Sequence, residues 1–523
     1  MNRSALPSLN RRALLQLLGA TGAASLAYGL RSVAFAAEAD TLVWARPTET
    51  TLYDPHNSAL SSAWNVQHLC YESLVTLDDN LEVVPALATA WEWQGNTLVF
   101  TLREGVKFAN GRAMTQDDVV GSITRALGSA GNPWGLILRN LKATTKVGTN
   151  QVAMEFDGPN RAALSAMTAS LVCIVPMEES VAGTWDATTD KLWGTGPYLV
   201  ESHVANDHWV LVKNPHYWNA GLPKIGKLVV RTIASTQGIV AALTDGTADI
   251  ASFEGNPDAS ALLAGIANVT VAPQYQTAYS FLAVNAVTEG SVFKDLKMRQ
   301  AVALALDRQQ IVDFAFAGQS VPSYGYTQFK LGDDSALPLY ARDVEKAKAL
   351  ITEAAPAKTQ VNLIYANGDL DANVSQVIKQ QLAEIGLDVQ LEGLEEGVWL
   401  SRTWTGQPSE FDLNVTYFSG FSHPLITAHW WAPELAGFDA GHVAVDPAYT
   451  ELLNKALFAA SDADYDSTML ALYARINEQA NLIPLCSRTE TMAWRSDRVT
   501  MTPSAMQAQE DVLAGVENFT LNG

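Results

Sequence analysis

The most informative stretch of this chain is Gly194-Thr195-Gly196-Pro197-Tyr198, followed by Trp209-Val210-Leu211-Val212 and Asn214-Pro215-His216-Tyr217-Trp218. Two glycines and a proline form a rigid turn that neither a continuous helix nor a central strand can contain. The apolar run that follows is typical of a strand. Alone, the stretch is a turn between strands, so its meaning depends on the motifs around it.

Other short motifs stand in a fixed order on both sides of this turn. They are Tyr71-Glu72-Ser73-Leu74, Val84-Pro85-Ala86-Leu87-Ala88 with Trp91, Leu98–Phe108, Asp117-Asp118-Val119-Val120, Asn285, Phe293-Lys294-Asp295, Arg299-Gln300-Ala301 and Ala305-Leu306-Asp307-Arg308. Each motif is common by itself, and their shared order carries the resemblance. With these motifs the chain resembles the extracytoplasmic solute-binding proteins of dipeptide, oligopeptide and nickel ABC importers over nearly its whole mature length.

The size and charge of the chain narrow its class. At 523 residues it is too long for one ordinary core, and its length predicts two to four domains. A hydrophobic content of 48% and a mean hydropathy of +0.03 indicate a globular protein. The net charge of −21 argues against nucleic acid or an anionic membrane as a partner.

Residues 1–36 resemble an export signal, with four arginines and no acidic residue. Asn10-Arg11-Arg12-Ala13-Leu14-Leu15 resembles a twin-arginine motif. A membrane anchor needs about 20 strongly apolar residues, and the uncharged run after the motif is shorter and less apolar than that. Ala34-Phe35-Ala36 offers a cleavage site before Ala37. We therefore expect a periplasmic protein whose signal is cleaved near Ala36, with a retained anchor as the alternative. Export is expected by the twin-arginine route, with the Sec route as the alternative.

The three cysteines, Cys70, Cys173 and Cys486, form an odd set, so they cannot all pair internally. Cys70 and Cys173 lie in apolar sequence, which predicts buried free thiols. One disulfide with one thiol left over is the alternative in an oxidising compartment.

The apolar patterns predict a mixed α/β chain. Strands are expected at Leu98–Leu102, Val152–Phe156, Val361–Tyr365, Val389–Leu391 and Phe411–Tyr417. Helices are expected at Ala162–Ser170, 298–305, 307–318 with Asp307 as cap, Val344–Ala354, 374–385, from Asp446-Pro447 onward, and at Met469–Gln479. From about residue 285 helices alternate with strands, which favours a lobe of βαβ units.

The resemblance implies the architecture and the mode of action. It implies a two-lobed α/β periplasmic-binding-protein fold with an extra inserted domain and a ligand cleft between the lobes. Lobe I would comprise residues 38–53, 193–284 and 486–523, the insert 54–192, and lobe III 285–485. Strands that cross between the lobes would provide a hinge, and ligand would close the cleft. The resemblance also implies a monomer that delivers a small solute to an ABC permease.

Motifs of known enzyme classes do not occur in the chain, so we do not expect an enzyme. It contains no Gly-x-Ser-x-Gly, His-Glu-x-x-His, Walker loop or Cys-x-x-Cys. A pair of acids across a pocket cannot be recognised in linear sequence, so an exported hydrolase stays open. We expect no cofactor and no protein-bound metal. His423 and His429 match no standard metal spacing, although contact with a metal complex is the alternative.

The segment Val415–Pro424 corresponds to the stretch that runs beside the bound peptide in peptide-binding relatives. In those relatives it carries an aspartate that holds the ammonium group of the peptide. Gly420 takes that place here, and no acid occurs in the segment. A buried ammonium needs a carboxylate partner. Either another residue supplies the carboxylate, or the ligand is not an ordinary free-amino peptide.

Side chains near this segment and after the first strand are the candidate ligand contacts. They are Thr51, Leu52, Tyr53, Arg402, Tyr417, Phe418, Ser419, Gly420, Phe421, His423, Trp430 and Trp431. The aromatic rings suit sugar rings or apolar side chains, with core packing as the alternative. Arg402 suits a ligand carboxylate or phosphate, with a solvated surface position as the alternative. Residues 51–53 equally fit an ordinary surface loop.

The function predicted from the sequence is a solute-binding component of an ABC importer for a peptide or peptide-like solute. Within the binding class, the alternative is a receptor for a sugar, an opine-like compound or a metal chelate. Outside that class, the alternatives are an exported hydrolase and a soluble partner of a chemoreceptor or chaperone.

The export route can be tested with the double substitution Arg11→Lys and Arg12→Lys. The twin-arginine machinery reads the arginine pair, so we expect the precursor to accumulate unprocessed. The measurement is a pulse–chase of precursor and mature protein in cell fractions. Normal processing of the double variant would indicate the Sec route instead.

Overall fold

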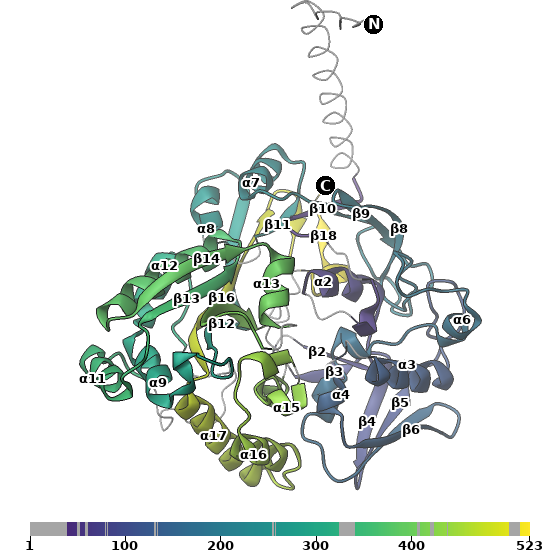
Figure 1. The fold of residues 1–523 in the computed structure, drawn as a ribbon. Coiled ribbons are helices and arrows are strands. Elements are labelled where there is room, and N and C mark those ends of the chain that lie inside the picture. The colour runs from purple at the N-terminus through teal and green to yellow at the C-terminus, as the bar shows by residue number, and fades with distance from the viewer. Residues whose placement is uncertain are drawn as a thin grey trace, which may run out of the picture.

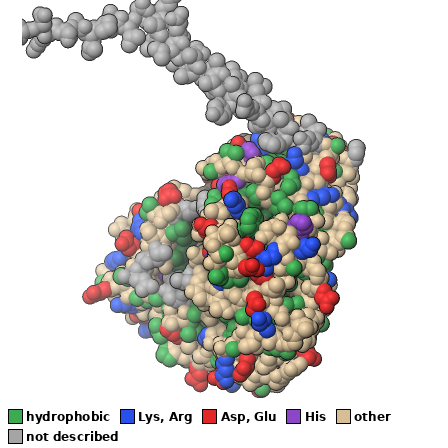
Figure 2. Space-filling view, turned by 90° about the vertical axis from the view of Figure 1, so that its right-hand side faces the viewer, with side chains coloured by type: hydrophobic (Ala, Val, Ile, Leu, Met, Phe, Trp, Pro, Cys, Tyr) green, Lys and Arg blue, Asp and Glu red, His purple; other side chains and the backbone are tan. Residues whose placement is uncertain are grey.

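The computed structural model describes residues 39–49, 53–57, 61–78, 80, 82–129, 132, 134–253, 256, 258–323, 340–404, 408–418, 423–436, 438–501 and 513–522. The predicted export signal, residues 1–36, lies outside the described residues. Within the part that is described, no helix is long and apolar enough to cross a membrane. Figure 2 shows acidic and basic side chains interspersed over one face of the molecule.

A ten-stranded mixed sheet runs through the molecule in the order β14-β13-β15-β12-β16-β11-β1-β10-β9-β8 (Figure 1). Its strands are β1 (Thr41–Arg46), β8 (Tyr198–Val204), β9 (His208–Lys213), β10 (Lys227–Thr232), β11 (Ile250–Ser252), β12 (Val269–Val284), β13 (Gln360–Ala366), β14 (Asp388–Leu394), β15 (Leu413–Phe418) and β16 (Leu482–Arg495). The strand predicted from Trp209 to Val212 is therefore confirmed as β9.

Two long antiparallel strands, β12 and β16, hold the two halves of this sheet together. Their pairing runs from Val269 opposite Arg495 to Ala283 opposite Leu482. β16 also pairs with β11 in one half, and β12 also pairs with β15 in the other. The register shifts between the pairs Tyr275–Thr489 and Tyr279–Ser487, so three residues of β12 face Arg488 alone. Such irregular pairing bends a ladder locally.

The half of the sheet that contains β13, β14 and β15 is covered by helices. They are α9 (Leu296–Ala305), α10 (Arg308–Ala315), α11 (Val344–Ala354) and α12 (Asp369–Glu384). The three strands run parallel to one another, as the alternation of helices and strands predicts. Apolar side chains of these helices form a core with alternate residues of β12, β13 and β15.

The short motifs around Arg299 and Arg308, which carry part of the resemblance, have structural roles in the half of the sheet with β13, β14 and β15. The Arg299 guanidinium donates to the Gln479 carbonyl at 2.7 Å, and Arg308 donates to the Pro484 carbonyl at 2.8 Å. The Asp307 side chain accepts from the Gln310 amide at 3.0 Å, which confirms Asp307 as the cap of α10. These contacts fix helices α9 and α10 to strand β16 and the end of α17 (Asp462–Gln479).

Residues between β1 and β8 form a separate small sheet with its own helices, at the lower right of Figure 1. Its strand order is β4-β5-β7-β6, from β4 (Ala88–Gln94), β5 (Thr97–Leu102), β6 (Leu141–Val147) and β7 (Gln151–Phe156), beside the pair β2 (Val75–Leu77) and β3 (Val83–Pro85). The helices are α2 (Ser61–Cys70), α3 (Gln116–Gly128), α4 (Trp134–Ile137), α5 (Ala163–Ala166) and α6 (Met177–Ala182), with short 3-10 turns η2 (Pro55–Asn57) and η3 (Ser170–Val172).

The helix predicted over Ala162–Ser170 is wrong. Only one helical turn, α5, forms there, followed by the short turn η3. The Trp134 indole donates to the Ala166 carbonyl at 2.8 Å, which is a carbonyl that a continuing helix needs. A tertiary contact therefore ends the helix that the local pattern favours.

The remaining elements complete the chain. They are α7 (Thr236–Asp245), α8 (Asp258–Leu263), η4 (Val292–Lys294), α13 (Glu396–Thr403), α14 (Pro424–His429), α15 (Pro433–Ala436), η6 (Phe438–Gly441), α16 (Pro447–Leu457), β17 (Val499–Thr500), η8 (Val516–Asn518) and β18 (Thr520–Leu521). The helix predicted at Val344–Ala354 and the start at Asp446-Pro447 are confirmed. The division into lobe I, insert and lobe III stays a prediction.

The three cysteines are buried and free, which confirms the prediction for them. Burial raises the pKa of the Cys70 and Cys173 thiols well above the ordinary value. These cysteines therefore act as small apolar core residues.

Candidate ligand-binding site

The glycine-proline turn lies directly against the end of helix α2. The Gly196 amide donates to the Cys70 carbonyl at 2.9 Å, and the Ala109 amide donates to the Gly194 carbonyl at 2.9 Å. A Cβ added at Gly194 would overlap the Cys70 carbonyl oxygen, and one at Gly196 would lie 2.7 Å from the Cys70 carbonyl carbon. Close backbone approach is therefore the reason for both glycines.

The carboxylate of Glu72 joins the early motif to the turn. Thr195 Oγ1 donates to Glu72 Oε2 at 2.8 Å, and Trp218 Nε1 lies 3.0 Å from both carboxylate oxygens. The Arg103 guanidinium carbon lies over the Trp218 ring, 3.9 Å from its centre, which is a cation–π contact. Burial, with a further contribution from the charge of Glu517, raises the pKa of Glu72 to about 7.

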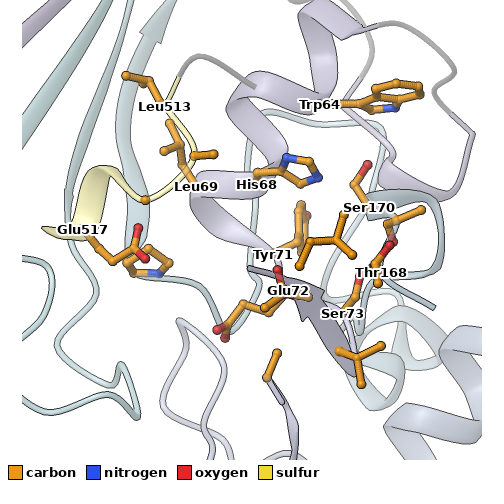
Figure 3. Close-up of a pocket in the computed structure, with 18 of the residues that line it drawn as sticks. Trp64, His68, Leu69, Tyr71, Glu72, Ser73, Thr168, Ser170, Leu513 and Glu517 are labelled. Carbon is orange, nitrogen blue, oxygen red and sulfur yellow. Dashed lines mark hydrogen bonds between the residues drawn. The ribbon is translucent and has the colours of Figure 1, made fainter. Parts of the chain in front are cut away.

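A cavity of about 340 Å³ opens beside Glu72 (Figure 3). Trp64 and His68 of α2 line one side, and Glu517 of η8 comes from the C-terminal part of the chain. The loop with Thr168 and Ser170 closes another side. The volume is at the low end of the range for small-molecule sites. Sequence reasoning missed this cavity, because its walls come from segments far apart in the chain.

The end of strand β15 carries aromatic side chains on one face of the sheet. Phe418 stacks on Phe281 with ring centres 4.9 Å apart, and Trp431 meets Phe418 edge-on at 4.8 Å. Trp430 and Trp431 are each only 4% exposed, and both belong to a core that they share with side chains of the small sheet; Trp430 packs on Trp134 there. Phe418 thus forms the border between this core and the end of the strand.

Tyr417 points to the opposite face of the sheet, because side chains alternate along a strand. Arg488 of β16 lies over the Tyr417 ring, with its guanidinium carbon 3.6 Å from the ring centre. This contact is a cation–π interaction next to the irregular pairing of β12 and β16. Sequence reasoning missed Arg488, because only the sheet order places it beside β15.

Both candidate histidines have structural roles in the short helix α14. His423 caps the helix, with the Leu425 amide donating to its Nδ1 at 3.3 Å. His429 Nδ1 donates to the Leu425 carbonyl, and Arg139 contacts the other ring nitrogen. Burial lowers the pKa of His423 to about 4 and that of His429 to about 3, so both are neutral at pH 7. Among the described residues, no group of three or more His, Cys, Asp or Glu is placed to hold a metal ion.

Two other candidates lie apart from Tyr417 and Phe418. Arg402 donates to Glu392 at 2.8 Å and to the Glu410 carbonyl at 2.9 Å, before β15 begins. The Tyr53 ring packs on Trp209 of β9, with ring centres 5.6 Å apart, toward the opposite edge of the sheet. Thr51, Leu52, Ser419, Gly420 and Phe421 lie outside the described residues. Ligand contact by any of these twelve candidates stays a prediction.

The comparison with known proteins identifies the family. Residues 82–431 match the family "Bacterial extracellular solute-binding proteins, family 5 Middle". The chain belongs to this family. It is therefore a solute-binding component of ABC importers, and the family consists of binding proteins rather than enzymes.

Two curated relatives are similar to this chain over most of its length. The "Di/tripeptide-binding protein 2" of Pseudomonas aeruginosa is 28% identical over 73% of this chain and 78% of the relative. The "Glutathione-binding protein GsiB" of Salmonella paratyphi A is 25% identical over 90% of both chains.

Two solved structures share the fold. The periplasmic binding protein DppA from Helicobacter pylori, in complex with the peptide STSA, matches with a TM-score of 0.78 and 21% identity, covering 88% of this chain and 94% of that one. AgaA from A. tumefacien R10, in complex with agropinic acid, matches with a TM-score of 0.81 and 21% identity, covering 92% and 99%. The predicted α/β periplasmic-binding-protein fold is thereby confirmed.

The close approach at the turn can be tested with Gly196→Ala. The added Cβ would crowd the Cys70 carbonyl carbon at 2.7 Å. We expect a loss of roughly 1–3 kcal/mol in the free energy of unfolding, as for other overpacked sites. Gly128→Ala is the matched control, because no atom lies within 4 Å of a Cβ there. Equal urea midpoints for the two variants would contradict the argument.

Because the pKa of Glu72 is raised in the folded protein, the free energy of unfolding should depend on pH. Its pKa in the folded protein is raised to about 7 from 4.5, so the folded state holds this proton more tightly than the unfolded chain. Its contribution to stability is full below about pH 4.5 and declines as the pH rises to about 7. In Glu72→Gln this decline should be absent, so the change in unfolding free energy between pH 5 and pH 8 should shrink. Urea unfolding at both pH values measures it, and an unchanged difference would refute the assignment.

Proposed function

We propose that this protein is a periplasmic receptor that binds a peptide or peptide-like solute between two lobes and delivers it, closed, to a membrane permease. The observation that carries this proposal is the end of β15. The pairing of β13 with β15 ends at Tyr365 opposite Val415. Among the described strands, residues Thr416–Phe418 therefore pair on one side only, with β12.

An unpaired strand edge of this kind suits an extended ligand backbone. Such a backbone can add to the edge as a further strand and place its side chains in alternating directions. Tyr417 and Phe418 would then contact the ligand from the two faces of the strand, with Ser419, Gly420 and Phe421 continuing beyond them. Thr51 and Leu52 would approach from lobe I. Trp430, Trp431 and His423 would support this wall from behind.

The proposed movement is a hinge closure at the two crossing strands. β12 and β16 are the long strands that join the halves of the sheet, and their ladder is irregular near its middle. A ligand that contacts both halves would shift the population from open to closed. The proposed lobes keep the boundaries that the resemblance implies: residues 38–53, 193–284 and 486–523 for lobe I, 54–192 for the insert and 285–485 for lobe III. The protein would act as a monomer after removal of residues 1–36.

Two classes of solute are candidates for the ligand of this protein. The relatives include proteins named for di- and tripeptides and for glutathione, and a protein solved with agropinic acid. The absence of an acid from Val415 to Pro424 disfavours an ordinary free-amino peptide held in the usual way. An opine-like solute is the second candidate. The cationic Arg488, which lies over Tyr417 of β15, favours a solute that carries carboxylates.

The proposal is tested by binding and closure. The solute that copurifies with the protein is identified by mass spectrometry and removed, and small-angle scattering is recorded with and without it. We expect the solute to reduce the radius of gyration and to raise the melting temperature, because it binds the native state alone. An unchanged radius at saturating solute would contradict hinge closure, and turnover of the solute would indicate a hydrolase.

A further inference from the structure

The insert and lobe III, with the boundaries proposed above, share one hydrophobic core. It contains Phe100 and Trp134 of the insert together with Leu453 and Met469 of helices α16 and α17 in lobe III. In Figure 1 the two regions meet in the lower half of the molecule. The chain also joins lobe I to lobe III through β12 and β16. The shared core is therefore a second connection to lobe III, and it starts from the insert.

Arg161 of the insert, which lies between β7 and α5, holds the corner where α16 ends and α17 begins. Its backbone amide donates to the Leu457 carbonyl at 3.0 Å, and its Nε donates to the Ala459 carbonyl at 3.0 Å. Its Nη1 lies 2.8 Å from Oδ1 of Asp462. The last carbonyls of a helix have no partner within the helix and carry a partial negative charge, so a guanidinium is favourable at this place.

Arg139 is a second arginine of the insert that reaches the same part of lobe III. Its Nη2 donates to Oδ1 of Asn454 in α16, and its guanidinium carbon lies 5.4 Å from the centre of the Phe458 ring. Its Nη1 contacts the ring of His429 in α14. Burial lowers the pKa of Arg139 to about 10, because the cation is partly removed from water where the insert meets lobe III. Hydrogen bonds are stronger in such surroundings, so these partners help to hold the insert.

The main-chain acceptors contribute more to this contact than the ion pair does. The side chain of Asp462 is 91% exposed, so water and salt screen its attraction to Arg161. Leu457 and Ala459, whose carbonyls accept from Arg161, are buried. All of these partners belong to the chain itself, so the contact between the insert and lobe III needs no solute to complete it.

We propose that Arg161 and Arg139 form a latch that holds the insert against lobe III, so that a closed population exists before any solute binds. This inference rests on the proposed function, because closure of the lobes is part of it. The insert is fixed to lobe I, since the Gly196 amide donates to the Cys70 carbonyl at 2.9 Å. Opening of the cleft therefore separates the insert from lobe III and breaks the latch. The latch thus lowers the free energy that a solute must supply to complete closure.

The latch can be tested without any solute by measuring the distance between the insert and lobe III. Thr149→Cys, in the turn between β6 and β7, and Gln380→Cys, in α12, place one nitroxide label on each at exposed positions. The native cysteines are buried and free, so they react slowly with the label. Pulsed electron–electron double resonance is recorded after the copurified solute has been removed. We expect a closed population, whose label distance agrees with this structure, beside an open population with longer distances.

In the labelled protein, Arg161→Gln should lower the ratio of closed to open molecules about tenfold, as expected when hydrogen bonds of a charged group are lost. Arg342→Gln is the matched control and should leave the ratio unchanged. Arg342 donates to the Ala305 carbonyl at 3.2 Å and pairs with Glu384 at 2.8 Å, so it makes the same two kinds of bond, but within lobe III. Melting curves show whether each variant is folded. If Arg161→Gln does not fold, Asn454→Ala removes an acceptor of Arg139 and should lower the ratio about fivefold.

Two results would overturn the latch: the absence of a closed population from the solute-free native protein, or a native ratio in a folded latch variant. A failure of the proposed function gives a different result. The solute recovered from the purified protein is added back to the labelled native protein and to Arg161→Gln. If it raises the closed population of either one, closure by solute stands, whatever becomes of the latch. If it changes neither distribution, closure by solute itself fails.

Discussion

The glycine-proline turn and the end of helix α2 are in direct backbone contact, which holds two distant segments of the chain together. Gly194 and Gly196 lie so close to the Cys70 backbone that no side chain fits there. The Glu72 carboxylate, one residue beyond Tyr71, is held by Thr195 and Trp218. This contact closes the segment between β1 and β8 as a unit and returns the chain to the large sheet at Tyr198.

A second constraint is the pair of crossing strands. β12 and β16 pair with each other between β11 and β15 in the sheet order. A movement of one half of the sheet relative to the other therefore requires these two strands to bend or twist. Their irregular pairing places Arg488 opposite extra residues of β12, and its guanidinium meets Tyr417. This contact therefore lies where the two halves of the sheet are joined.

Local patterns predicted individual helices, strands and caps, but not which distant side chains meet. The helix Val344–Ala354 and the cap at Asp307 follow from neighbouring residues, so the sequence alone predicts them. The helix expected at Ala162–Ser170 fails because the Trp134 indole takes a carbonyl that the helix needs. Ligand contact by Tyr417 and Phe418 stays a prediction, whereas the contact of Arg488 with the Tyr417 ring could not be foreseen, since no linear pattern links β16 to β15.

The sequence by itself determined the family, the α/β class and the positions of several strands and helices, because periodicity, caps and glycine-proline turns act over a few residues. Only the tertiary structure decided which side chains meet. In the folded protein His423 caps helix α14 and His429 lies in its last turn. Arg402 forms an ion pair with Glu392, and the Arg488 guanidinium lies over the Tyr417 ring. Such contacts depend on strand order and on burial, and both arise only when distant segments pack together.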